Sequence, residues 1–262
     1  MSWRDGHALN GARVLAEETA VAISYNGSTH AVLMSTPADL EDLAVGFSIT
    51  EGIVGSISGI EQIGVVDHEL GLEVQVRVRD DVAERLAARR RSMAGPVGCG
   101  MCGLESLEAA TRDLPSVQVA MMFASSDIVA AVQSIERLQD LNGRTGAAHA
   151  AGFFVPGAPV ELVREDVGRH NALDKLIGAL LRTGVAPSGG GMVVTSRVSV
   201  ELVQKAAVAG CGLLAAISAP TAFAVRAAQA ADITLAAVVR GGSFEVFSRP
   251  DRVQTGVVAD VA

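Results

Sequence analysis

Residues 191–239 read GMVVTSRVSVELVQKAAVAGCGLLAAISAPTAFAVRAAQAADITLAAVV. Three short apolar runs, MVV, LLAAI and ITLAAVV, have the length and composition of buried strands. The longer segments between them, one beginning VELVQKAAVAG and one beginning at Thr221, have the pattern of helices. Strand, helix, strand, helix and strand in this order predict a parallel or mixed sheet covered by helices, which places the fold in the α/β class.

The same alternation continues on both sides of this stretch. FEVFS, at 244–248, closes the pattern as a short strand. On the N-terminal side we expect a helix over 125–143, with Ser126 as its cap and Asn142-Gly143 as its stop. Strands at 147–155 and 160–165 and a helix at 171–184 follow. Residues 115–250 are therefore predicted to form one α/β domain.

The first part of the chain has a different pattern. Asn26-Gly27 stands between two apolar runs and is a strong signal for a β-hairpin. Thr36-Pro37 predicts a helix start, with Thr36 as cap and Asp39 as its capping-box partner. LEVQVRVR, at 72–79, alternates apolar and polar residues as a half-buried strand does. We expect a small α+β domain at 13–95, a connector at 96–114 and a tail at 251–262.

Composition limits the possible classes of function. The 262 residues are 49% hydrophobic and only 3% aromatic, with a formal net charge of -8 and three cysteines. An acidic chain is a poor general partner for nucleic acid, whose binding requires an excess of Lys and Arg. We see no signal peptide and no apolar run long enough to span a membrane. Few cysteines and no leader predict a cytoplasmic protein.

Polar residues follow the predicted strands of residues 191–239. Thr195-Ser196-Arg197 follows the first strand, Ser218-Ala219-Pro220-Thr221 the second, and Arg240-Gly241-Gly242-Ser243 the third. Ligands of open α/β sheets bind at this edge, and helix N-termini, arginines and glycine-rich backbone bind anions there. Together the turns predict a site for a phosphorylated ligand. The chain lacks the glycine fingerprints of dinucleotide and P-loop folds.

Cys99 and Cys102 lie three residues apart in the loop GPVGCGMCG, residues 95–103. From the residues alone, the pair is half of a zinc site, a redox dithiol or a nucleophile that carries sulfur. A zinc deaminase would place H-x-E before P-C-x-x-C, and that motif is absent, so we expect no metal. The third cysteine, Cys211, has apolar neighbours and is predicted to be buried and inert.

Two further polar features have no assigned role from sequence. The run Glu165-Asp166-Val167-Gly168-Arg169-His170-Asn171 opens a predicted helix, where Asp166 or Asn171 would serve as a cap or the run would orient a ligand or thiol. His149 stands in the apolar run AAHAAGFF, where a core histidine is the ordinary interpretation and a general base or metal ligand the rarer one.

The whole set of motifs resembles the formate dehydrogenase accessory sulfurtransferases, the FdhD family. The resemblance covers nearly all of the chain and rests on DLAVGFSITEGIV (42–54), CGMCG (99–103), TGAAHAAGFF (145–154), REDVGRHNALDKLIG (164–178), TSRVSVELVQKAAVAG (195–210), SAPTAFAV (218–225) and VVRGGSFEVFS (238–248). It implies a cytosolic homodimer that takes persulfide sulfur from a cysteine desulfurase. That sulfur passes to the molybdenum cofactor, bis-molybdopterin guanine dinucleotide, which is destined for formate dehydrogenase.

The resemblance also implies a fold and site residues. The second domain would be cytidine-deaminase-like, an α/β/α domain with a mixed sheet that has lost its zinc site. Cys99 would carry the persulfide, with Cys102 as an assisting or resolving thiol. The family's cofactor-binding segment matches Val238, Val239, Arg240, Gly241, Gly242 and Ser243. The turns with Ser218, Thr221, Thr195 and Arg197, chosen from the residues alone, would supply anion sites for the cofactor's phosphates. Val238 replaces the family's usual aromatic residue and Ser243 a common basic one.

Two alternatives remain open from the sequence. The first is a non-catalytic chaperone that binds the molybdenum cofactor and hands it over. The second is a dimer in which zinc holds structural cysteines. Uptake of sulfur by the loop cysteines would distinguish the sulfurtransferase from both alternatives.

Overall fold

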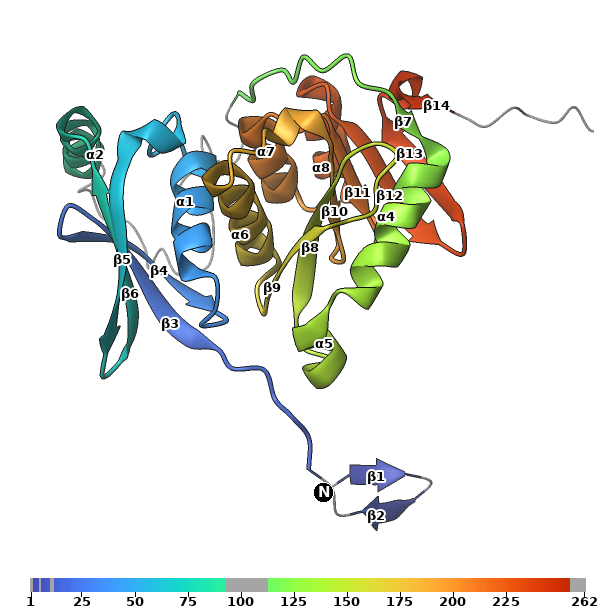
Figure 1. The fold of residues 1–262 in the computed structure, drawn as a ribbon, viewed down its shortest axis with the longest axis horizontal. Helices are drawn as coiled ribbons and strands as arrows, with labels where there is room; N and C mark the ends of the chain where they lie inside the picture. Colours follow the sequence, from blue (N-terminus) through green and yellow to red (C-terminus); the bar gives the residue numbers. More distant parts are fainter. Residues whose placement is uncertain (1, 5, 10–11, 93–112, 255–262) are drawn as a thin grey trace, which may run out of the picture.

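The structure is a computed structural model that describes residues 2–4, 6–9, 12–92 and 113–254. Two sheets with helices between them make up the main body of the molecule (Figure 1). A four-stranded sheet packs on helix α1 (Leu40–Thr50), and α1 packs on helix α6 (Arg169–Arg182). Helix α6 in turn covers a six-stranded sheet, so the two sheets lie on opposite sides of a shared layer of helices.

The N-terminal sheet has the strand order β4-β3-β6-β5. Its strands are β3 (Thr19–Tyr25), β4 (Ser28–Ser35), β5 (Ile60–His68) and β6 (Gly71–Val78). Asn26 and Gly27 both have positive φ, at 47° and 81°, as a two-residue hairpin turn between β3 and β4 requires. The hairpin prediction and the alternation in β6, where Val74, Val76 and Val78 are buried, are confirmed.

Several smaller elements flank this sheet. Helix α2 (Asp80–Ser92) follows β6 and adds Val82 and Leu86 to the core beneath the sheet, and a 3-10 turn (Ile57–Gly59) precedes β5. A short hairpin of β1 (Ser2–Arg4) and β2 (His7–Leu9) stands apart from the body at the N-terminal end of the chain (Figure 1).

The second sheet has the order β13-β12-β11-β10-β8-β9. Strands β10 (Gly191–Val194), β11 (Leu213–Ala216) and β12 (Thr234–Arg240) are parallel to one another. Strand β8 (His149–Phe154) is antiparallel to β10, and β9 (Leu162–Asp166) is antiparallel to β8. Strand β13 (Ser243–Ser248) is antiparallel to β12. The prediction of a mixed sheet in an α/β fold is confirmed.

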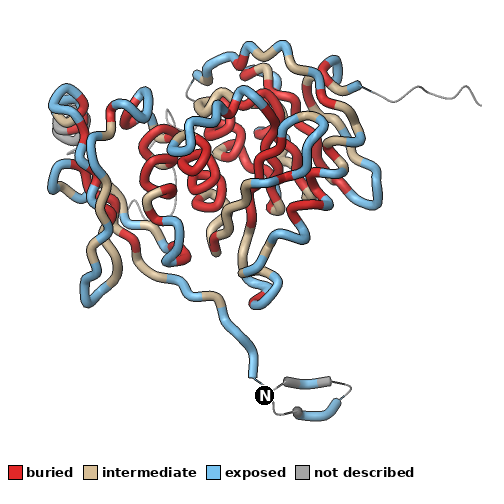
Figure 2. The backbone as a smooth tube through the Cα atoms, in the orientation of Figure 1, coloured by how far each residue is buried: buried red, intermediate tan, exposed pale blue. Residues whose placement is uncertain are grey.

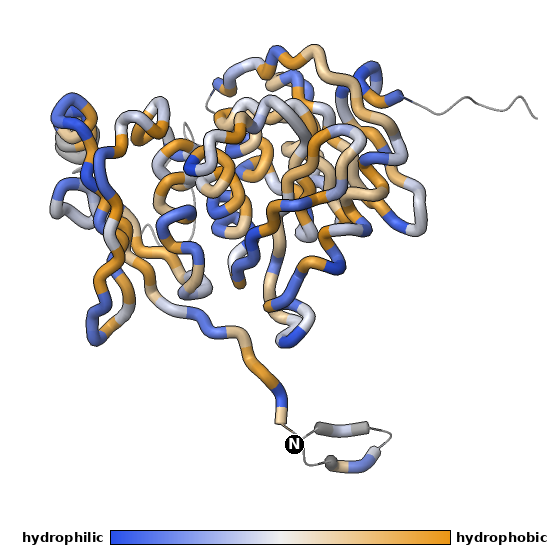
Figure 3. The backbone as a smooth tube through the Cα atoms, in the orientation of Figure 1, coloured by the Kyte–Doolittle hydropathy of each residue, from blue (hydrophilic) through white to orange (hydrophobic). Residues whose placement is uncertain are grey.

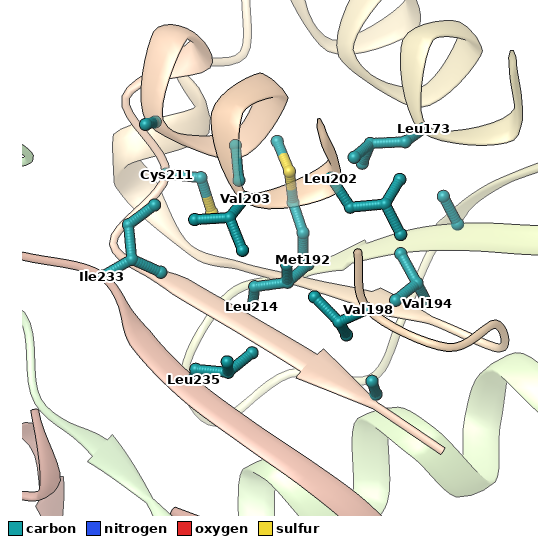
Figure 4. Close-up of a cluster of buried hydrophobic side chains, with 14 of the residues drawn as sticks. Leu173, Met192, Val194, Val198, Leu202, Val203, Cys211, Leu214, Ile233 and Leu235 are labelled. Carbon is teal, nitrogen blue, oxygen red and sulfur yellow. The ribbon is translucent and has the colours of Figure 1, made fainter. Parts of the chain in front are cut away.

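Helices cover both faces of this sheet. Helix α6, α7 (Val200–Ala209) and α8 (Ala222–Ala230) pack on one face, and α4 (Ser125–Arg137) packs on the other. The buried residues run through α1, α6, α7 and the central strands (Figure 2), and hydrophobic residues predominate along the same strands (Figure 3). Figure 4 shows hydrophobic side chains from β10, β11, β12, α6 and α7 that pack together with Cys211 in this core.

Helices α1 and α6 cross at two glycines. A Cβ atom at Gly46 would lie 1.8 Å from the Asp174 carbonyl oxygen, and one at Gly178 would lie 1.9 Å from the Asp42 carbonyl oxygen. No side chain fits at either position, so the two helix backbones touch here. This close contact joins the N-terminal sheet to the second sheet.

Three predicted helix boundaries are wrong. Helix α1 begins at Leu40 with Asp39 at its cap position, and the Thr36 hydroxyl instead accepts a hydrogen bond from the Val167 N–H at 3.1 Å. Ser126 lies inside α4, whose cap position is Ala124. Asn142-Gly143 lies inside α5 (Asp140–Thr145). In the first case, the Thr36 hydroxyl does not cap α1, because it bonds to Val167, which directly follows β9.

The end of the described chain packs on the body. A 3-10 turn (Pro250–Arg252) leads to β14 (Val253–Gln254), which pairs with β7 (Phe123–Ala124). Arg252 is buried and donates to the carbonyl oxygens of Asp232 and Val117. The division of the chain at residues 95, 114 and 250 stays a prediction. Within the described residues, no helix is long and apolar enough to cross a membrane.

Candidate functional site at the carboxyl edge of the second sheet

The carboxyl ends of the parallel strands bring the predicted turns to one edge of the second sheet. Residues 195–197 follow β10, residues 218–221 follow β11, and β12 ends at Arg240. Because β8 runs antiparallel to β10 and β9 runs antiparallel to β8, the start of β8 and the end of β9 reach the same edge. Helices α6 and α7 therefore also begin there, and ligands of open α/β sheets bind at this position.

Backbone hydrogen bonds hold the first two turns together. Val198 forms a parallel bridge with Pro220, through Val198 N–H to Ala219 oxygen and Thr221 N–H to Val198 oxygen. The Thr195 hydroxyl accepts from the Ala150 N–H at 3.0 Å, which extends the pairing of β8 and β10. The Thr221 hydroxyl caps α8 by accepting from the Ala224 N–H. Both threonine hydroxyls thus have structural partners.

The third turn is a β-hairpin between β12 and β13. Gly241 and Gly242 have φ values of 56° and 89°, and the Ser243 hydroxyl donates to the Arg240 carbonyl oxygen. Val238 has a φ of 57°, which is an unusual conformation for a β-branched residue, and its N–H donates to the Ser218 carbonyl oxygen at 3.4 Å. Residues held in such conformations concentrate at binding sites.

The predicted residues therefore differ in what they offer to a ligand. Ser218 is half-buried beside Val238, and Val239 is buried in the core on the other face of the sheet. Arg197 and Arg240 are exposed, and neither guanidinium makes a hydrogen bond or ion pair with another described residue. These two cations, with the glycine backbone of residues 241–242, are the groups that remain free to bind an anion.

A second group of polar side chains lies at the same edge, and we call it the edge cluster: His149, Arg169, His170, Ser199 and Glu201. His170 Nε2 is 3.4 Å from the Ser199 hydroxyl and 3.9 Å from Glu201 Oε2. Serine and glutamate both approach the same ring nitrogen, whereas a catalytic triad places them on opposite nitrogens. The arrangement is therefore not a serine nucleophile with its base.

Electrostatics make the two histidines neutral at physiological pH. Burial lowers the pKa of His170 to about 4, and the charges of Arg169 and Lys205 act in the same direction. Burial and Arg169 also lower the pKa of His149, against the effect of Asp166. For Glu201, burial acts to raise the pKa, but hydrogen bonds from Ser199 and the backbone outweigh it and keep the pKa below its usual value. The edge cluster thus holds one cation, one anion and two neutral imidazoles.

The acidic residues of the Glu165–Asn171 run hold the fold together. Glu165 accepts from the N–H groups of Leu141 and Asn142 at the start of α5. Asp166 is fully buried and pairs with the buried Lys175, with 2.6 Å between Oδ2 and Nζ. Asp166 also accepts from the Ser35 hydroxyl and from the backbone N–H groups of Thr36 and Gly168. Within this run, only Arg169 and His170 are left for the edge cluster.

The cysteines fall into two groups. Cys211 is fully buried, its thiol donates to the Leu213 carbonyl oxygen, and burial raises its pKa to about 11. The prediction that this residue is buried is confirmed. Cys99 and Cys102 lie outside the described residues. Elsewhere in the chain, the described histidines, cysteines and acidic residues form no group of three that could hold a metal ion.

Sequence reasoning left out Ser199 and Glu201. Both stand at the start of the helix that follows β10, in the segment Ser199-Val200-Glu201. Polar residues at such a helix start are ordinarily explained as caps or first-turn acids. Their position after a central parallel strand indicates a place at the ligand-binding edge of the sheet. Their contact with His170, however, depends on α6 beginning beside α7, which the sequence pattern does not show.

The comparisons with known proteins agree with this architecture. The chain matches the FdhD/NarQ family over residues 16–254. It is 54% identical over 251 residues to the sulfur carrier protein FdhD of Agrobacterium fabrum, with 95% of this chain and 93% of that protein covered. It is 49% identical over 252 residues to the sulfur carrier protein FdhD of Cupriavidus necator, with 96% of this chain and 88% of that protein covered.

A solved structure has the same fold. The crystal structure of a candidate formate dehydrogenase accessory protein from Desulfotalea psychrophila superimposes with a TM-score of 0.75 and covers 97% of this chain and 96% of its own. At 22% identity this likeness concerns the fold. The family match and the two relatives extend over nearly the whole chain, and on that basis the chain belongs to the FdhD/NarQ family.

Proposed function

We propose that this protein is a sulfurtransferase that accepts persulfide sulfur from a cysteine desulfurase on Cys99. It passes the sulfur to the molybdenum cofactor, bis-molybdopterin guanine dinucleotide, for use by formate dehydrogenase. The observation that carries the proposal is the similarity of nearly the whole chain to relatives named sulfur carrier protein FdhD. The acceptor is a substrate here, and we propose that the protein works in the cytoplasm as a homodimer.

The choice of cysteine follows from the requirements of sulfur transfer. A carrier thiol has to be ionised in part and reachable by the donor. Cys211 meets neither condition, because it is fully buried and its pKa is raised to about 11. Of the three cysteines in the chain, that leaves Cys99 and Cys102. The family resemblance favours Cys99 as the carrier.

The transfer can be written as two exchanges at sulfur. The Cys99 thiolate attacks the outer sulfur of the donor persulfide, so a Cys99 persulfide forms and the donor cysteine leaves as its thiolate. Cys102 then attacks the inner sulfur of that persulfide, and hydrosulfide leaves for the cofactor. This second exchange leaves a disulfide between Cys99 and Cys102, which a thiol reductant reopens.

The edge of the second sheet supports the binding half of the proposal. A guanine dinucleotide carries phosphates, and the free guanidinium groups of Arg197 and Arg240 with the Gly241-Gly242 backbone suit such anions. Val238, whose backbone is strained beside Ser218, and Ser243 belong to the same β12–β13 hairpin as Arg240. We propose that these turns bind the phosphates of the cofactor.

Intact mass spectrometry tests the carrier assignment. After incubation with a cysteine desulfurase and L-cysteine, wild type and Cys211→Ala should each gain sulfur, and Cys99→Ala should gain none. Cys102→Ala should gain sulfur but restore formate dehydrogenase activity poorly in cells that lack the accessory protein. Sulfur on Cys99→Ala would refute the carrier assignment. A wild type that binds GDP but never gains sulfur would instead identify a non-catalytic cofactor chaperone.

A further inference from the structure

The edge cluster contains two enclosed polar atoms without a hydrogen-bond partner. Among the described residues, only three enclosed side-chain atoms have none: Ser24 Oγ, Arg169 Nε and Glu201 Oε2. Two of the three thus belong to one cluster at the carboxyl edge of the second sheet. Enclosed polar groups in native proteins are almost always paired, so each unpaired one requires an explanation, and a missing ligand is one such explanation.

The two atoms are of opposite kinds. Arg169 Nε–H is a donor, and Glu201 Oε2 is an acceptor on an ionised carboxylate. A phosphate would satisfy Arg169 but would be repelled by Glu201, and a metal cation would meet the reverse problem. The complementary ligand is uncharged at this position and presents an acceptor beside N–H donors.

A ligand can reach the edge cluster from solvent. The side chain of Glu201 is 33% exposed and that of His170 is 36% exposed. The Glu201 carboxylate therefore borders solvent while it lies beside His170. His170 is neutral at physiological pH and therefore adds no charge beside the carboxylate.

The edge cluster is also continuous with the turns that carry free arginines. The bridge between Val198 and Pro220 places the start of α7, with Ser199 and Glu201, against the turn at residues 218–221. Val238 N–H then joins that turn to β12 and its hairpin. The edge cluster and the turns therefore belong to one continuous edge of the second sheet.

We propose that Glu201, supported by Arg169, recognises the 2-amino-4-oxopyrimidine edge that guanine and pterin share. The ring N–H and the amino group of that edge donate to the carboxylate, and its oxo group accepts from Arg169. This inference rests on the proposed function, because guanine and pterin are both parts of the proposed cofactor. It adds the residues that select the base, whereas the turns bind phosphates common to all nucleotides.

Matched ligand pairs test the proposal in the wild-type protein. IDP is GDP without the 2-amino group, and lumazine replaces the amino group of pterin with an oxo group. Calorimetry should show GDP binding at least about tenfold more tightly than IDP, or pterin more tightly than lumazine, which is the effect of one hydrogen bond to a charged acceptor. Preference within the first pair identifies guanine at the site, and preference within the second identifies pterin.

Variants then assign the preference to Glu201. Glu201→Gln should reduce the preferred ratio to about one. Because IDP and lumazine keep the ring N–H, their affinity should also fall, but by a smaller factor than that of GDP or pterin. Arg240→Gln should weaken the binding of GDP and of IDP by the same factor, so the ratio of the two affinities should stay unchanged. Glu136→Gln, the same change at an exposed position of α4, should alter neither the affinities nor their ratio.

The outcomes separate this proposal from the proposed function. Wild-type protein that prefers neither GDP over IDP nor pterin over lumazine would overturn it, and this comparison stands even if Glu201→Gln fails to fold. A preference that survives in folded Glu201→Gln would overturn it as well. Sulfur uptake by Cys99, measured by mass on the same preparation, reports on the proposed function independently.

Discussion

His170 is the residue whose charge state the fold changes most clearly in the candidate site. Its pKa falls from 6.5 to about 4, first because of burial and then because of the charges of Arg169 and Lys205, with Glu201 and Glu51 opposing. Between those pH values the unfolded chain binds more protons at this residue than the folded chain does. The free energy of unfolding therefore falls as the pH is lowered through this range and is fully retained above it.

We predict that His170→Gln flattens this dependence. Urea unfolding of wild type should lose stability between about pH 7 and about pH 5, and the variant should lose less over the same interval. At about pH 7 the two proteins should differ mainly by the lost contact with Ser199. If wild type and variant show parallel pH profiles, burial does not hold this imidazole neutral.

Single residues mark the limit of what the sequence could predict at the site. The burial of Cys211 followed from its apolar neighbours, and the helix that begins after Thr221 followed from the pattern of its segment. Glu201 could not be identified in this way, because its significance depends on His170, which is 31 positions away and lies on another helix. Local pattern fixes which face a side chain occupies, but it does not give its neighbours from other elements.

At the level of elements, the crossing of α1 and α6 depends on the absence of two side chains. Alanine normally stabilises a helix interior relative to glycine by roughly 0.5–1 kcal/mol. At Gly46 and Gly178 a Cβ atom would instead fall within 2.0 Å of a backbone oxygen of the facing helix, at 1.8 Å and 1.9 Å. The clash between such a Cβ atom and the facing backbone therefore outweighs the gain in helix propensity from alanine.

We predict that Gly46→Ala and Gly178→Ala each destabilise the protein by about 1–3 kcal/mol or more. Gly143→Ala is the matched control, since Gly143 is also helical and a Cβ atom there meets nothing within 4 Å. It should be neutral or slightly stabilising. Urea unfolding of the three variants measures the difference, and equal stability in all of them would mean that the helices separate at little cost.

Elements with strong local signals were predicted, and elements positioned by distant contacts were not. Asn26-Gly27 specifies its turn through positive φ, and the alternation in β6 specifies its buried face. The start of α1 was misplaced because the Thr36 hydroxyl accepts from Val167, which directly follows β9 of the second sheet. The strain at Val238 also had no local signal, because a β-branched residue is expected in ordinary strand geometry.

For the whole molecule, Asp166 is a buried residue at which polar groups join the two sheets. Its carboxylate accepts from Ser35 and Thr36 at the end of β4 and from Gly168 and Asn171 at the start of α6. Lys175 pairs with the same carboxylate and donates to the Thr36 carbonyl oxygen at 2.9 Å. Donors from the end of β4 and from α6 thus meet at one buried carboxylate on β9. Separating the N-terminal sheet from the second sheet would leave that carboxylate without part of its hydrogen bonds.

We predict that Lys175→Met destabilises the protein by about 3–5 kcal/mol, because it leaves the Asp166 carboxylate buried without its counter-charge. Adding Asp166→Asn should recover part of that loss, because the double variant holds no uncompensated charge. Arg85→Met, which removes an exposed ion pair with Asp81, should change stability little.

Hydrogen exchange in urea distinguishes a joint from a local effect. If Asp166 and Lys175 couple the sheets, Lys175→Met lowers the protection of amides in β3 and in β11 by the same free energy. The two sheets then still unfold together, since the crossing of α1 and α6 remains. Loss of protection in β3 and β4 alone would mean that the ion pair stabilises only the N-terminal sheet, and additive effects in the double variant would mean that the two charges are not coupled at all.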